Sequence, residues 1–240
     1  MTQLNLASGL LLVTGIATVV ATFAQCGPAK ATTNAQDPQA HAKKSGEQDP
    51  VPPPPDAIRI LISGLMLGRL EPCGCASGQL GGLARRMQHI GEQRNYDLLL
   101  EGGDLISGTS ELDKQKLFTA SQILFTMERS YDAVGVGLHD LELPLEDWSG
   151  FLLGGPAVAS NLTSTAELWP AKTFQEKVIR DKTVRIASLL LPELPEALRG
   201  EKSHVQRTDP AAAWTKVFAG QADTTMRIAM VHGTDTQIRA

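Results

Sequence analysis

The chain has 240 residues, of which 42% are apolar and 20% charged, a composition typical of a globular protein with one or two domains. Its 26 acidic and 22 basic residues give a net charge of −4, so there is no overall positive field to attract a nucleic acid. Aromatic residues make up only 5%, which leaves few surfaces on which bases could stack. We therefore expect no nucleic-acid partner.

The N-terminal segment predicts export. Residues 1–26 carry no charged side chain, and residues 6–24 form an apolar run interrupted only by serine and threonine. Its length is close to the ~20 residues that span a bilayer, so residues 1–26 are predicted to be a signal peptide or an N-terminal membrane anchor. Cleavage after Ala24 or after Ala31 fits the small residues that signal peptidase accepts, and lipidation of Cys26 is a further alternative. We expect a periplasmic protein or one anchored in a membrane and facing outward.

Residues 27–57 have the composition of a linker. They contain few apolar residues and many prolines, including an uninterrupted run at 52–55. Such a segment cannot bury a core, and the proline run favours extended polyproline II structure. We predict a disordered, Pro-rich tether in front of one folded domain that covers residues 58–240.

Within residues 58–240, short apolar runs alternate with longer helical patterns. Strands are predicted at residues 58–62, 96–100, 132–136, 157–159, 177–180, 183–191 and 226–231. Helices are predicted at residues 82–94, 112–129 and 210–219. The last helix has Asp209 as its N-cap, and Asp181 lies in the turn of a predicted hairpin. This alternation is typical of an α/β fold.

The unusual polar residues of the domain follow the ends of four predicted strands. Cys73 and Cys75 follow the first strand, Asp104 the second, His139 the third and His232 the last. In open α/β sheets, ligands bind beyond the carboxyl ends of the strands. We therefore expect these five side chains to border one crevice.

Four short motifs in this domain resemble a known family. They are the segment 60–69, the Gly-Gly-Leu-Ala-Arg-Arg run at 81–86, the run 102–108 that begins Gly-Gly-Asp, and the run 131–140. Together they resemble the catalytic domain of secreted 5'-nucleotidases, which are calcineurin-like metallophosphoesterases. The resemblance covers about residues 58–161, with a weaker piece at 226–233. It implies a metallophosphoesterase-like sandwich of two mixed β-sheets flanked by helices.

The resemblance also implies a site for two divalent cations, such as zinc or manganese, bridged by an aspartate that helps to clamp a phosphate and to activate water. Asp104 stands at the bridging position. His139 stands where the family has the histidine that assists the leaving group, and His232 at the first of the late metal-binding histidines. On this basis the partner is a small phosphorylated molecule.

Three ligand positions of that implied site carry leucine. Leu65 and Leu67 replace the Asp-x-His motif that opens the family's domain, and Leu138 replaces a liganding asparagine. Leucine cannot bind a cation, and the family's final Gly-His-x-His motif is absent, so we expect the sequence to be truncated before it. A degenerate two-metal site is predicted, and whether the chain is an enzyme stays open.

The Glu-Pro-Cys-Gly-Cys run suggests a different chemistry. With His139 and His232, Cys73 and Cys75 would make a sulfur and imidazole set suited to zinc or copper. Alternatively, the pair cycles between a dithiol and a strained disulfide with a redox partner, or is structurally inert. The insert resembles a divergent nucleotidase-like branch, some members of which are fused to multihaem cytochromes, although no Cys-x-x-Cys-His motif occurs in this chain.

The leading prediction is an extracytoplasmic, nucleotidase-like protein with a degenerate phosphoesterase site and a Cys-x-Cys redox or metal site. One alternative is an active metal-dependent phosphoesterase with unusual ligands. Another is a non-catalytic module attached to a missing electron-transfer domain. Arg85 and Arg86 are interpreted as a salt-bridged pair on a helix surface.

Overall fold

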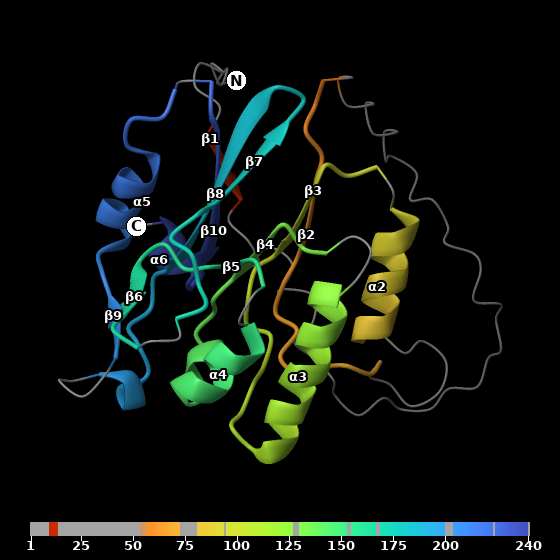
Figure 1. The fold of residues 1–240 in the computed structure, drawn as a ribbon, viewed down its shortest axis with the longest axis vertical. Coiled ribbons are helices and arrows are strands. Elements are labelled where there is room, and N and C mark those ends of the chain that lie inside the picture. Colours follow the sequence, from red (N-terminus) through yellow and green to blue (C-terminus); the bar gives the residue numbers. More distant parts are fainter. Residues whose placement is uncertain are drawn as a thin grey trace.

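The computed structural model describes residues 10–13, 54, 56–72, 81–93, 95–126, 130–152, 155–166, 169–199, 204–222 and 224–239. Cys73 and Cys75 lie outside the described residues, as does most of the predicted linker. The described residues form two four-stranded sheets and one two-stranded sheet, with helices on their outer sides (Figure 1).

The first sheet is parallel throughout. Its strands lie in the order β2 (Ile60–Ser63), β3 (Leu98–Glu101), β4 (Ala133–Gly135) and β5 (Ala157–Val158). Parallel neighbours need crossover connections, and the helices supply them. These are α2 (Leu83–Glu92), α3 (Glu111–Thr126) and α4 (Leu145–Leu152), which lie together on one side of the sheet (Figure 1). The strands and helices predicted for this half are confirmed, while α4 was missed.

The second sheet is mixed. Its order is β1 (Leu10–Val13), β10 (Met226–His232), β8 (Lys182–Leu190) and β7 (Gln175–Ile179). The pair β7–β8 is the predicted hairpin, and Arg180 and Asp181 make its turn with φ angles of 47° and 65°. Helix α5 (Pro210–Phe218) packs against this sheet. Its predicted N-cap is confirmed, because the Asp209 carboxylate accepts the N–H of Ala212 at 2.7 Å.

Several short elements were not predicted. They are the two-stranded antiparallel sheet β6 (Leu162–Ser164) and β9 (Val205–Arg207), the 3-10 turns η1 (Asp140–Glu142) and η2 (Glu196–Leu198), and α6 (Asp235–Arg239). Strand β1 falls within the apolar N-terminal run and pairs in parallel with β10. None of the helices in the described part of the chain is long and apolar enough to cross a membrane.

The core consists of three apolar layers, and these show how the sheets and helices are stacked. Leu98 and Leu100 of β3 pack with Ile186 of β8 and Ile228 of β10, which places the two sheets face to face. Leu99, between them in sequence, packs with the helices on the other side of the first sheet. Helix α5 covers the outer side of the second sheet through Val217 and Phe218, which pack on Ala187. The predicted sandwich of two sheets flanked by helices is therefore confirmed, although only the second sheet is mixed and the first is parallel. The carboxyl ends of β3, β4 and β10 meet at one edge.

Candidate functional site

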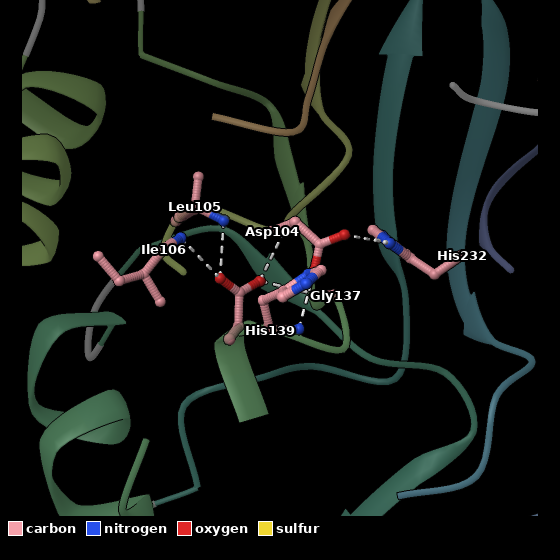
Figure 2. Close-up of polar contacts among 7 residues, drawn as sticks. Asp104, Leu105, Ile106, Gly137, His139 and His232 are labelled. Carbon is pink, nitrogen blue, oxygen red and sulfur yellow. Dashed lines mark hydrogen bonds and ion pairs between the residues drawn. The ribbon is translucent and has the colours of Figure 1, made fainter. Parts of the chain in front are cut away.

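Three of the five predicted site residues meet at that edge (Figure 2). Asp104 follows β3, and its Oδ1 accepts the backbone N–H of His139 at 3.0 Å and lies 3.2 Å from His139 Nδ1. Its other oxygen, Oδ2, lies 3.7 Å from Nδ1 of His232 at the end of β10. A single carboxylate thus lies between two imidazoles from different sheets.

The charge on Asp104 is stabilised by these contacts. Burial raises the pKa of Asp104, but the contacts with His232 and His139 outweigh it, so the pKa of this carboxyl falls below its ordinary value of 3.8. Asp104 is therefore ionised at neutral pH. The side chain of His139 is 41% exposed and that of His232 only 5%, so solvent reaches the cluster from the His139 side.

Asp140 organises the loop around Asp104 and was not identified from the sequence. Its Oδ2 accepts the N–H groups of Asp104 and Gly137 at 2.8 and 2.9 Å, and its Oδ1 accepts those of Leu105 and Ile106 at 2.7 and 3.4 Å. Burial and the neighbouring Asp104 carboxylate raise the pKa of Asp140 to about 7. The carboxylate joins the loop after β3 to the loop after β4.

Glu101, at the end of β3, anchors a second buried network that was also missed. Its Oε2 accepts hydrogen bonds from Ser63 Oγ at 2.6 Å and from Arg86 Nη1 at 2.8 Å. Burial raises the pKa of Glu101, while Arg86 opposes that rise. Tyr131 shares a 2.8 Å hydrogen bond with Ser63, and burial together with the Glu101 charge raises its pKa to about 12. The predicted salt bridge of Arg86 is therefore present, but its partner is the buried carboxylate of Glu101 rather than a surface group.

Glycines allow the loops of the site to approach each other. A Cβ on Gly137 would lie 2.1 Å from Asp104 Oδ1, and one on Gly103 would lie 2.7 Å from the carbonyl oxygen of Gly135. No side chain fits at either position. Glycine is therefore required in the Gly-Gly-Asp and Gly-x-His motifs, because it lets the loops after β3 and β4 come into contact.

The leucines at the expected ligand positions lie beside this cluster. The N–H groups of Leu65 and Leu67 donate to the carbonyl oxygens of Gly103 and Asp104 at 3.1 and 2.9 Å, and both leucine side chains are half-buried. They offer no donor atom to a cation. Leu138 also packs at the margin of the core rather than offering a polar group.

The donor atoms present do not fit two divalent cations. The cluster supplies one carboxylate and two imidazoles, and Asp140 uses both of its oxygens on backbone N–H groups. Over the residues that the structure describes, no group of three or more histidine, cysteine, aspartate or glutamate side chains is arranged to hold a metal ion. Nε2 of His232 is buried without a hydrogen-bond partner among these residues.

The two predicted cysteines belong to the segment 73–80, which is outside the described residues. Its two flanks lie together, because a Cβ on Gly82 would lie 2.7 Å from the nitrogen of Pro72. The segment that precedes the cysteines contacts the loop after β3, since the N–H of Gly68 donates to the carbonyl oxygen of Leu105 at 2.9 Å. The shared site of the cysteines with Asp104 stays a prediction.

Comparison with known proteins supports the fold. No protein-family profile and no curated protein matches the chain. Among solved structures, the 5'-nucleotidase precursor from Thermus thermophilus is 20% identical with a TM-score of 0.59, over 73% of this chain and 37% of that one. The NAD nucleotidase of Haemophilus influenzae is 17% identical with a TM-score of 0.54, over 76% of this chain and 35% of that one.

The calcineurin-like phosphoesterase YfkN from Bacillus subtilis is also similar. It is 21% identical with a TM-score of 0.51, over 73% of this chain and 61% of that one. The chain thus spans between 35% and 61% of the length of these three proteins. Together with the two facing sheets and the Asp104 loop, the comparisons show that this chain has the fold shared by these 5'-nucleotidases and calcineurin-like phosphoesterases.

Proposed function

We propose that the chain is an extracytoplasmic, nucleotidase-like protein whose phosphoesterase site no longer forms a two-metal hydrolytic centre, and that Cys73 and Cys75 provide a redox or metal site in its place. The fold and the N-terminal apolar segment support the first part. The observation that carries it is the donor set at Asp104, where Leu65 and Leu67 occupy the positions beside the carboxylate that faces both imidazoles.

The proposed ligand of the residues that remain is a small phosphorylated molecule. Asp104 is ionised and favours the tautomer of His139 that carries a proton on Nδ1. In that tautomer, Nε2 of the partly exposed His139 ring is the proton acceptor. Without cations to neutralise the developing negative charge, we do not expect this arrangement to hydrolyse a phosphate ester.

In the redox form of the proposal, the cysteines react with a disulfide of a partner protein. One thiolate attacks the partner's disulfide to give a mixed disulfide, and the second thiolate displaces the partner's remaining sulfur. The partner gains two electrons and leaves as a dithiol after taking up two protons from solvent, equal to those that the chain's thiols released, and the chain is left with a Cys73–Cys75 disulfide. In the metal form, the same thiolates bind zinc or copper.

The hydrolysis test uses the full chain supplied with manganese or zinc. We expect little release of phosphate from nucleotides or aryl phosphates, because leucines stand at three ligand positions. Phosphate release is measured alongside that of an Asp104→Ala variant, which should match the wild-type background. Robust turnover that Asp104→Ala abolishes would refute the proposal and establish an active phosphoesterase with unusual ligands. This second candidate is favoured by Nε2 of His232, which is buried and has no hydrogen-bond partner in the described part of the chain.

The cysteine test combines thiol reactivity with metal analysis on one preparation. A redox pair is expected to contain a thiol with a lowered pKa, and a disulfide more oxidising than the roughly −300 mV limit of structural disulfides. A metal site instead predicts stoichiometric zinc or copper that Cys73→Ser and Cys75→Ser each remove and His139→Ala weakens. Cys26→Ser serves as the matched control. Ordinary thiol pKa values together with no bound metal would rule out both forms.

A further inference from the structure

The backbone beside Asp104 has an unusual conformation at two leucines. The φ angles of Leu65 and Leu67 are 51° and 50°, and that of Asp104 is 53°. All three residues therefore lie in the left-handed region. Hydrogen bonds hold them there, because the N–H groups of both leucines donate to the carbonyl oxygens of Gly103 and Asp104.

Leucine is a poor residue for this conformation. In the left-handed region the Cβ atom crowds the following carbonyl oxygen, and among residues other than glycine it is asparagine, aspartate and histidine that are enriched there several-fold. Two leucines separated by a single residue are thus held in a conformation that suits asparagine, aspartate or histidine better. Strain of this kind persists only where the surrounding structure fixes the backbone, as the paired loop does here.

We propose that residues 64–68 keep the backbone of a cation-binding loop, and that the leucine side chains at positions 65 and 67 are what prevents a cation from binding beside Asp104. The substitutions Leu65→Asp and Leu67→His would then add a carboxylate and an imidazole to those of Asp104 and His232. Two carboxylates and two imidazoles suit one manganese or zinc ion. The inference rests on the proposed function, since it takes the present site as unable to hold the ion.

The first test concerns the backbone alone. Leu65→Asn and Leu67→Asn replace leucine by a residue of similar length that accepts the left-handed conformation, so relief of strain should offset the lost apolar contacts and leave Tm unchanged or higher. Leu70→Asn is the matched control, because Leu70 is a half-buried residue of the same loop without a positive φ angle. Its Tm should fall by several degrees. Equal losses in all three variants would overturn the inference.

The second test measures metal binding without reference to activity. The variant Leu65→Asp/Leu67→His is titrated calorimetrically with manganese or zinc chloride, and its metal content is measured after dialysis. We expect about one ion per chain, bound at least about tenfold more tightly than by the wild type, and a loss of about tenfold or more when Asp104→Asn is added. Wild-type affinity in a variant with unchanged circular dichroism would overturn the inference.

The two proposals fail in different ways. If the wild-type chain binds manganese and hydrolyses nucleotides, the proposed function is wrong. The inference about the loop is judged separately, from the difference between the Leu65→Asp/Leu67→His variant and the wild type. A wild type that binds no ion, beside a double variant that also binds none, leaves the proposed function standing and removes the inference.

Discussion

Replacing Asp140 by alanine is expected to lower the free energy of unfolding by about 3–5 kcal/mol. The Asp140 carboxylate accepts four backbone N–H groups and is 1% exposed, so its loss leaves buried donors without an acceptor. Each such donor costs about 1–3 kcal/mol, reduced where the loop relaxes. Urea unfolding at fixed pH measures the change. A loss below about 1 kcal/mol would show that the two loops hold together without this carboxylate.

The pH dependence of stability provides a separate check on Asp140. Its folded-state pKa of about 7 lies above the ordinary 3.8, so between these values the folded chain binds this proton more tightly than the unfolded chain. The contribution to stability is complete below pH about 4 and is lost as the pH rises to about 7, with a slope of at most about 1.4 kcal/mol per pH unit. Asp140→Asn should lack this part of the pH dependence. Parallel pH curves for the variant and the wild type would contradict the assignment.

Replacing Arg86 by methionine is expected to destabilise the chain by about 3–5 kcal/mol, because the partner carboxylate is buried and loses its ion pair. Glu101 is 0% exposed, and the Nη1 of Arg86 donates to it at 2.8 Å. Arg85 is the matched control, since it precedes Arg86 on the same helix and is exposed. Arg85→Met should change the free energy of unfolding by no more than about 1 kcal/mol, the size of an exposed polar interaction.

A double-mutant cycle separates the charge from the packing in this pair. Adding Glu101→Met to Arg86→Met removes the uncompensated buried charge, so most of the lost stability should return. Denaturant unfolding of the wild type, both single variants and the double variant gives the coupling energy. Additive losses would mean that Arg86 acts through its alkyl chain rather than through its charge.

The sequence predicts the architecture well because its signals are local. Short apolar runs separated by helical patterns indicate parallel strands with helical crossovers, and the Asp209-Pro210 pair places the start of α5 at the residue observed. The elements that were missed have weak local signals. Strands β6 and β9 are three residues long, and they pair with each other across a long stretch of chain.

The candidate site was predictable only where a side chain has an unusual type at a strand end. Asp104, His139 and His232 were found in this way. Asp140 was not, because its partners are backbone N–H groups, which every residue except proline has, so the neighbouring residue types do not indicate the contact. Glu101 extends a buried strand and is paired through tertiary contacts with Arg86 and Ser63, so no local pattern points to it.

The division of the site between the two sheets has a consequence for the order in which it is assembled during synthesis. Asp104 and His139 both lie in loops that follow strands of the first sheet and are 35 residues apart, so their contact can form as soon as that half of the chain has folded. His232 stands at the end of β10, which pairs with β8 and is synthesised later. A nascent chain that has not yet reached β10 therefore holds at most half of the site. A ligand that contacts His232 would bind only the finished sandwich, and its binding would draw partly assembled chains toward completion.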